Sequence, residues 1–168
     1  MTTSRVSDDQ RRRALRDPLH LLSFGLGTGF APWAPGTVGT ALAVPLAWYL
    51  GQLGFLIYAL TTLVITVSGI WLCERTSRWL NTHDHRAIVI DEIAGYLITM
   101  LLLPKTWLWL LAGFVAFRAF DIFKPPPITW LDGNVKGGLG IMLDDVAAAI
   151  YASLALYIVV WGYGLITN

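Results

Sequence analysis

Two long stretches of the sequence contain no charged side chain. Residues 37–73 and residues 146–168 lack Asp, Glu, Lys and Arg altogether. A helix that crosses the hydrocarbon core of a bilayer needs about 20 apolar residues, so Phe55–Cys73 and Val146–Ile166 are each long enough to span it. The chain as a whole is 55% hydrophobic and only 14% charged, which is more apolar than most soluble proteins. The sequence therefore predicts an all-α, multi-pass membrane protein.

Three shorter apolar segments cover residues 38–50, with Pro45 inside, residues 88–103 and residues 107–123. Their lengths fit crossing helices, re-entrant helices, or buried helices of a soluble bundle. Together with the two long segments they predict a bundle of about four to five apolar helices, with a loop-built site on one face. Residues 18–168 are expected to form this single domain, and residues 1–17 a polar arm that is mobile or a short interfacial helix.

The distribution of positive charge predicts the orientation. If the N-terminus is cytoplasmic and all five segments cross, then 11 of the 12 Lys and Arg residues lie at the cytoplasmic face, and only Lys105 faces the other way. This is the bias that cytoplasmic loops show. Trp107, Trp109 and Trp161 then lie toward the far interface. We expect a multi-pass membrane protein with its site facing the cytoplasm.

Several classes of protein are excluded or disfavoured. A single cysteine, Cys73, rules out an internal disulfide and is interpreted as a packing residue. The net charge of +1 and the absence of a basic helical stripe argue against nucleic-acid binding. No apolar segment follows the basic N-terminus closely enough for a cleaved signal peptide. The oligomeric state does not follow from the sequence.

Acidic residues occur at the ends of the apolar segments. Carboxylates are costly near hydrocarbon, so they are functional candidates there, although a simple helix-capping role is the alternative. The candidates for both catalysis and metal binding are Asp91, Glu92, Asp121, Asp144 and Asp145. The neighbours Asp91 and Glu92 are expected to point about 100° apart on a helix, so that one binds a metal and the other orients a ligand or water.

Cationic and small polar residues accompany the acids. Arg118, Asp121 and Lys124 share one helical stripe, which suits either phosphate binding or an internal salt bridge. The expected substrate-binding residues are Lys124, Arg118, His83, His85, Thr37, Gly36 and Asn134. The histidines, Thr37 and Gly36 each have an equally plain structural interpretation. A Gly137-Gly138-Leu139-Gly140 run allows close backbone approach to phosphate but is weak by itself.

An oxygen-rich ligand set indicates a hard cation. Mg²⁺ typically uses one or two carboxylates together with water and substrate phosphate. Neither a zinc spacing nor a Walker A loop is present. The sequence predicts a Mg²⁺ site that handles a phosphorylated substrate carried in the lipid bilayer.

Several uncommon strings occur in a fixed order along residues 18–150. They are His20-Leu21-Leu22, Pro32-x-x-Pro35-Gly36-Thr37-x-Gly39, His83-Asp84-His85-x-x-Ile88-Val89-x-Asp91-Glu92-x-x-Gly95, Phe117-Arg118-x-Phe120-Asp121-Ile122-x-Lys124-Pro125-x-Pro127-Ile128 and Gly137-Gly138-x-Gly140-Ile141-Met142-x-Asp144-Asp145. In these strings the chain resembles the phosphatidylglycerophosphatase A family of bacterial lipid phosphatases. One difference is Gly133, where a bulkier and often basic residue is expected.

The resemblance implies a Mg²⁺-dependent enzyme of the inner membrane. Its expected reaction is hydrolysis of phosphatidylglycerophosphate to phosphatidylglycerol and phosphate, in phospholipid biosynthesis. Lys124 is then the first candidate for phosphate binding and Glu92 for general base. Attack by water and an aspartyl-phosphate intermediate are both compatible with the residues.

Two other functions fit parts of the pattern. A CDP-alcohol phosphotransferase would also use Mg²⁺ and several Asp residues, but its Asp-Gly-x-x-Ala-Arg string is missing at Asp132-Gly133. A small ion-coupled transporter would place its carboxylates near mid-membrane and between repeats, whereas these acids lie at segment ends.

Overall fold

The computed structural model describes residues 6–167, and the side chains of residues 6–162. All regular structure in this part is helical, which confirms the all-α prediction. The elements are α1 (Asp8–Ala14), α2 (Pro18–Ser23), the 3₁₀ helix η1 (Gly25–Phe30), α3 (Pro35–Gln52), α4 (Phe55–Leu80), α5 (Ile90–Met100), α6 (Trp107–Phe123), α7 (Ile128–Asn134) and α8 (Gly137–Thr167).

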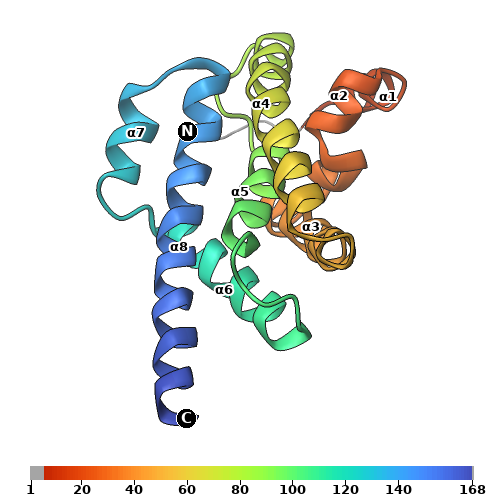
Figure 1. Ribbon diagram of the computed structural model, residues 1–168. Coiled ribbons are helices and arrows are strands. Elements are labelled where there is room, and N and C mark those ends of the chain that lie inside the picture. Colours follow the sequence, from red (N-terminus) through yellow and green to blue (C-terminus); the bar gives the residue numbers. More distant parts are fainter. Residues whose placement is uncertain (1–5, 168) are drawn as a thin grey trace.

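Helix α5 forms the centre of the molecule. It packs against α3, α4, α6 and α8, and nine of its 11 residues are buried (Figure 1). The phenol of Tyr58 donates a hydrogen bond to the carbonyl of Leu97, and that of Tyr96 donates to the carbonyl of Leu110, at 3.0 and 2.9 Å. Burial of these two phenols is therefore compensated by hydrogen bonds that tie α5 to α4 and α6.

Helices α4 and α8 are the two described helices that are long and apolar enough to cross a membrane. Within an apolar 18-residue stretch of each helix, only 22% of the residues in α4 and 28% of those in α8 are buried inside the protein. The core helix of a soluble protein would be mostly buried, whereas these helices expose large apolar side chains such as Leu63, Val64 and Ile158. The two long apolar segments predicted from the sequence are thus confirmed as helices, and they indicate association with a membrane.

Helix α8 starts earlier than the sequence suggested. We expected its apolar part to begin at Val146, with Asp144 and Asp145 ahead of the helix, but the helix begins at Gly137 and includes both acids. The expectation was wrong because it treated charge as a helix boundary. The two carboxylates are buried side chains within the helix, which is 31 residues long.

The glycines at the start of α8 serve helix packing. A Cβ atom on Gly138 would lie 2.0 Å from the carbonyl oxygen of Ile70, and one on Gly140 would lie 2.1 Å from that of Val135. The N–H of Gly138 donates a hydrogen bond of 2.6 Å to Oε2 of Glu74. Gly138 lets α8 approach α4 closely, and Gly140 lets it approach Val135 at the end of α7. The Gly138 amide is bonded to Glu74 and is therefore not available to a phosphate.

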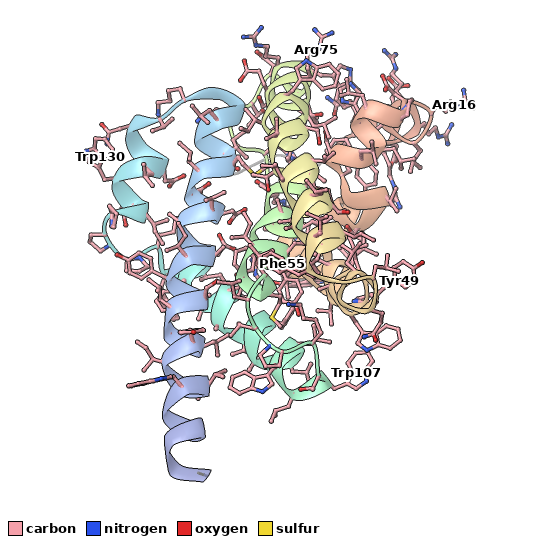
Figure 2. The ribbon with its side chains drawn as sticks, in the orientation of Figure 1. Arg16, Tyr49, Phe55, Arg75, Trp107 and Trp130 are labelled. Carbon is pink, nitrogen blue, oxygen red and sulfur yellow. The ribbon has the colours of Figure 1, made fainter. Side chains whose placement is uncertain are left out.

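The C-terminal ends of α3 and α5 and the N-terminal end of α6 meet at one end of the bundle. Lys105, between α5 and α6, packs on Gly51 near the end of α3, and its ammonium group lies 4.7 Å from the Tyr58 ring. The rings of Trp48 and Trp107 stack there at 6.2 Å. Figure 2 shows Arg16 and Arg75 at the opposite end of the molecule from Trp107. The bundle therefore has one aromatic end and one arginine-bearing end.

The described part of the N-terminal arm is folded against the bundle. Ser7 and Gln10 form a reciprocal capping box at the start of α1, and Ala14 at its end is buried beside Phe24 and Leu72. Helix α3 extends further than the predicted segment 38–50 and keeps Pro45 inside it. Residues 1–5 lie outside the described part of the chain.

Candidate active site

A cavity of about 370 Å³ brings together all five acidic candidates. Its wall comes from the start of α3, the loop before α5, the start of α5, the end of α6 and the second and third turns of α8. The lining residues are Ala34, Pro35, Gly36, Asp84, Arg86, Ile88, Asp91, Glu92, Arg118, Asp121, Ile122, Lys124, Asp144 and Asp145. Carboxylates that lie 54 residues apart in sequence, such as Asp91 and Asp145, thus share one site.

Three of these carboxylates form a compact group. Asp91, Glu92 and Asp145 each offer one oxygen, and the three oxygens lie within 4.8 Å of one another. Asp91 is 5% exposed and Asp145 is 3% exposed, so water screens their charges little. The expected divergence of Asp91 and Glu92 therefore does not separate them, because their side chains bend toward the same point.

Two glycines make this grouping sterically possible. A Cβ atom on Gly95 of α5 would lie 2.6 Å from the Phe117 ring and 3.1 Å from the carbonyl oxygen of Asp145. A Cβ atom on Gly36 of α3 would lie 1.9 Å from Oε1 of Glu92. The absence of side chains at these positions lets α3, α6 and α8 come close to α5 around the carboxylates.

The other two acids hold cations. Nη1 of Arg118 lies 2.5 Å from Oδ2 of Asp121 and 3.6 Å from Oε1 of Glu92. Nζ of Lys124 lies 2.5 Å from Oδ2 of Asp144. These side chains are mostly shielded from solvent, so water screens the attraction within each pair less than at the surface, and each carboxylate holds its cation at the cavity wall.

Lys124 receives a second anchor from outside the cavity wall. Its ammonium group lies 3.1 Å from Oδ1 of Asp132 on α7. Burial alone would lower the pKa of Lys124, but the hydrogen bonds and charges of Asp144 and Asp132 outweigh it and raise the pKa above its ordinary value. Lys124 is therefore a permanent positive charge at the cavity.

The acidic group fits a divalent cation. Oδ1 of Asp91 and Oε2 of Glu92 are buried and have no hydrogen-bond partner among the described residues. Buried carboxylate oxygens without a donor are costly, and a bound cation removes that cost. An all-oxygen donor set of this kind suits a hard divalent cation such as Mg²⁺, Ca²⁺ or Mn²⁺. The residues that fit the ion are Asp91, Glu92 and Asp145.

Four residues expected to bind substrate lie elsewhere. Thr37 does not line the cavity, and the side-chain amide of Asn134 donates to the carbonyl of Trp130 on the exposed side of α7. His83 lines a separate open depression with Glu74 and Arg78. Of the predicted substrate-binding set, the structure therefore brings Gly36, Arg118 and Lys124 to the acidic cavity.

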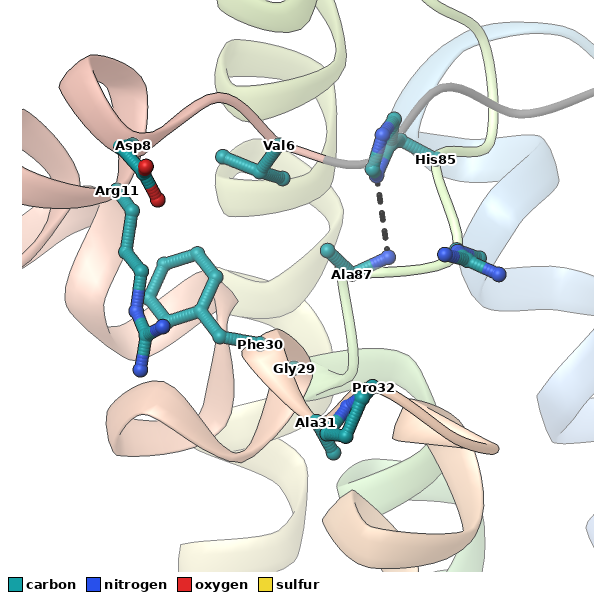
Figure 3. Close-up of a pocket in the computed structure, with 10 residues that line it drawn as sticks. Val6, Asp8, Arg11, Gly29, Phe30, Ala31, Pro32, His85 and Ala87 are labelled. Carbon is teal, nitrogen blue, oxygen red and sulfur yellow. Dashed lines mark hydrogen bonds between the residues drawn. The ribbon is translucent and has the colours of Figure 1, made fainter.

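His85 belongs to a neighbouring pocket. The residue is 3% exposed, and its Nδ1 accepts a hydrogen bond of 3.1 Å from the amide of Ala87, drawn as a dashed line in Figure 3. This pocket is formed with Arg11 and Phe30 from the N-terminal part of the chain, where the guanidinium lies 5.4 Å from the ring centre. This hydrogen bond from the backbone amide of Ala87 shows that His85 helps shape the loop before α5.

Asp84, Arg86 and Asp132 were not selected from the sequence as site residues. Asp84 and Arg86 line the cavity, and Asp132 reaches it through Lys124. Asp84 has a φ of 48°, a left-handed backbone that is uncommon outside glycine and often occurs at functional sites. The His83-Asp84-His85 run stands out in the sequence, but only its two histidines were predicted to be site residues.

The site is built mainly by helices. We expected a loop-built site, whereas Asp91, Glu92, Arg118, Asp121, Asp144 and Asp145 all lie within α5, α6 and α8. Helices position side chains more rigidly than loops do. The arrangement provides a carboxylate group for a cation beside two fixed positive charges, which suits chemistry on a phosphate group.

Sequence comparison assigns the chain to a family. The family model described as Phosphatidylglycerophosphatase A matches residues 21–160. The chain belongs to the phosphatidylglycerophosphatase A family. It is 42% identical over 159 residues to phosphatidylglycerophosphatase A of Escherichia coli strain K12, covering 93% of this chain and 92% of the relative.

A second relative gives the same assignment. Phosphatidylglycerophosphatase A of Haemophilus influenzae is 42% identical over 152 residues, covering 88% of this chain and 91% of that protein. No solved structure matches this chain. The phosphatidylglycerophosphatase A match includes every residue that lines the acidic cavity, from Ala34 to Asp145.

Proposed function

We propose that this protein hydrolyses the terminal phosphate monoester of phosphatidylglycerophosphate, releasing phosphatidylglycerol and phosphate in bacterial phospholipid biosynthesis. The observation that carries the proposal is the cavity in which the group Asp91, Glu92 and Asp145 faces Arg118 and Lys124. The names of the two bacterial relatives supply the identity of the lipid.

Mg²⁺ is the cation that we assign to the carboxylate group. Asp91, Glu92 and Asp145 would hold it, because their oxygens converge and two of the buried oxygens lack donors. When bound, Mg²⁺ supplies positive charge to the phosphate oxygens and acidifies a water molecule.

Arg118 and Lys124 bind the phosphate group. A phosphate monoester carries up to two negative charges, which a cavity lined by six carboxylates would otherwise repel. Arg118 offers a planar fork of donors and Lys124 a compact charge, and both suit phosphate oxygens. Asp121 and Asp144 hold these cations in place before substrate arrives, so little rearrangement is needed as charge develops in the transition state.

We further propose that the protein lies in the inner membrane with its cavity toward the cytoplasm. Arg16 and Arg75 lie at one end of the bundle and Trp107 at the other (Figure 2), which supports the expected orientation. Helix α5, with 11 residues, is only about 16 Å long and cannot cross alone. We therefore infer that α3, α4, α6 and α8 cross and that α5 extends from the cavity to the far interface inside them.

Purified protein in detergent tests this function. Phosphatidylglycerophosphate is supplied with Mg²⁺, and both inorganic phosphate and phosphatidylglycerol are measured. We expect the two products in equal amounts. Formation of neither product by folded protein would overturn the proposal and favour a transporter. Transfer of the phosphoalcohol of a CDP-alcohol to an acceptor hydroxyl, with release of CMP, would favour a phosphotransferase.

A further inference from the structure

The rim of the acidic cavity carries unusually exposed apolar side chains. Among the described residues, Phe123 and Trp33 are the most exposed large hydrophobic side chains, at 82% and 81%. Ile122 is 64% exposed and also lines the cavity. Exposed side chains of this size at the edge of a polar cavity mark an interaction site rather than ordinary surface.

The fold places these side chains at two neighbouring helix ends. Trp33 comes directly before Ala34, which lines the cavity and leads into α3, and Phe123 is the last residue of α6, directly before Lys124. Helices α3 and α6 pack against each other. Ala34 and Lys124 both have left-handed backbones, with φ of 42° and 41°. The chain therefore turns sharply at both positions, and at each one the preceding residue is an apolar side chain at the edge of the cavity.

Other residues of the cavity wall are polar. Asp84 and Arg86, in the loop before α5, are exposed and polar. The apolar rim formed by Trp33, Ile122 and Phe123 is therefore the part of the cavity edge that offers apolar contact.

We propose that the apolar rim of Trp33, Ile122 and Phe123 contacts the acyl chains of the lipid substrate where they leave the cavity. This inference rests on the proposed function. A cavity of about 370 Å³ lined by charged groups accommodates the polar headgroup, while two acyl chains belong in hydrocarbon. The headgroup carries negative charge toward Arg118 and Lys124, so the chains must leave by the side that offers apolar contact.

The test compares chain-length preference in variants of the rim. The value of kcat/KM is measured for dioleoyl and dihexanoyl phosphatidylglycerophosphate in the same mixed micelles, for wild type, Phe123→Ser and Trp33→Ser. We expect each substitution to lower kcat/KM for the dioleoyl lipid about tenfold, the scale of losing an aromatic contact with an apolar chain. The value for the dihexanoyl lipid should change much less, so the preference for long chains falls.

Two controls keep the test specific. Leu108→Ser removes an equally exposed apolar side chain, 74% exposed, from the other end of α6 and should leave the preference unchanged. Phe123→Trp should retain it. Equal losses for both lipids, or an unchanged preference in both rim variants, would overturn the inference. If wild type hydrolyses neither lipid, it is the proposed function that fails.

Discussion

Nζ of Lys124 lies 2.5 Å from Oδ2 of Asp144 and 3.1 Å from Oδ1 of Asp132. One ammonium group thus connects the end of α6 to α7 and α8 at the cavity wall. Asp132 does not line the cavity, so Lys124 can remain paired with Asp132 while its ammonium group binds a phosphate inside the cavity.

Replacement of Lys124 by methionine tests this charge. Lys124→Met keeps the length of the side chain but removes the charge, and we expect kcat to fall by about 100-fold, the usual scale for losing one stabilising contact to transition-state charge. Lys136→Met is the matched control, because Lys136 is exposed and bonds only to the nearby carbonyl of Gly133 among the described contacts. A near-normal kcat for Lys124→Met would remove Lys124 from the phosphate site.

A pair of glycine substitutions tests the steric role of α3. In Gly36→Ala the new methyl group would lie 1.9 Å from Oε1 of Glu92, so the carboxylate or the helix must move. We expect at least a tenfold loss of turnover, since small displacements of catalytic groups are costly. Gly133→Ala meets no atom within 4 Å and should retain activity. Equal activities of the two variants would show that the close approach of Gly36 to Glu92 is unimportant.

His20 provides a pH-dependent contribution to stability. Its buried ring bonds to Thr76 at 3.0 Å and stacks on Trp79 at 4.4 Å. Burial lowers the pKa of His20 below the ordinary 6.5, Asp17 opposes this and Arg75 adds to it. As the pH falls, the unfolded chain therefore binds the proton first. The stabilisation by neutral His20 is complete above about pH 6.5 and is lost as the pH falls toward the lower folded pKa.

The measurement is the difference in melting temperature between wild type and His20→Gln. We expect this difference to be larger at about pH 7.5 than at about pH 5.5, because the wild type loses the contribution of His20 in acid. Using the difference cancels the titration of groups that both proteins share. A difference that stays constant or grows in acid would show that the neutral ring is not the stabilising form.

Asp121 and Asp145 are expected to behave differently although both are carboxylates of one cavity. Asp121 pairs with Arg118, whereas Asp145 belongs to the convergent oxygen group. Asp121→Asn should therefore bind Mn²⁺, used as a spectroscopic substitute for Mg²⁺, as tightly as wild type while kcat falls by about 100-fold. Asp145→Asn should lose both Mn²⁺ binding and turnover. Loss of Mn²⁺ binding in Asp121→Asn would place Asp121 among the metal ligands.

The sequence predicted the apolar helices and the identity of the acids better than their arrangement. The charge-free stretches gave α4 and most of α8, because length and hydropathy alone determine whether a helix can span a bilayer. The start of α8 was predicted too late, because two adjacent acids, Asp144 and Asp145, resemble a helix boundary in the sequence. In the structure both are buried within the helix, and Asp144 pairs with Lys124. Local sequence carries no information about a partner 20 residues away.

Local sequence also did not predict which residues line the cavity. Asp84 and Arg86 line it because the loop before α5 turns toward α6 and α8, which no local pattern indicates. Conversely, His83 and Asn134 had suitable chemistry and proximity in sequence, but the loop that carries His83 and helix α7, which carries Asn134, direct them to other surfaces. Residue type identified the kind of site, and only the packing of helices selected its members.

The central claim is that a divalent cation held by Asp91, Glu92 and Asp145 supports hydrolysis of the lipid phosphate. Its most direct test is phosphate release from phosphatidylglycerophosphate by chelator-treated wild type and Asp145→Asn, titrated with Mg²⁺. We predict that wild type is inactive without Mg²⁺ and regains turnover saturably, and that Asp145→Asn stays inactive across the titration. Full turnover of wild type in excess chelator, or wild-type recovery by Asp145→Asn, would contradict the account.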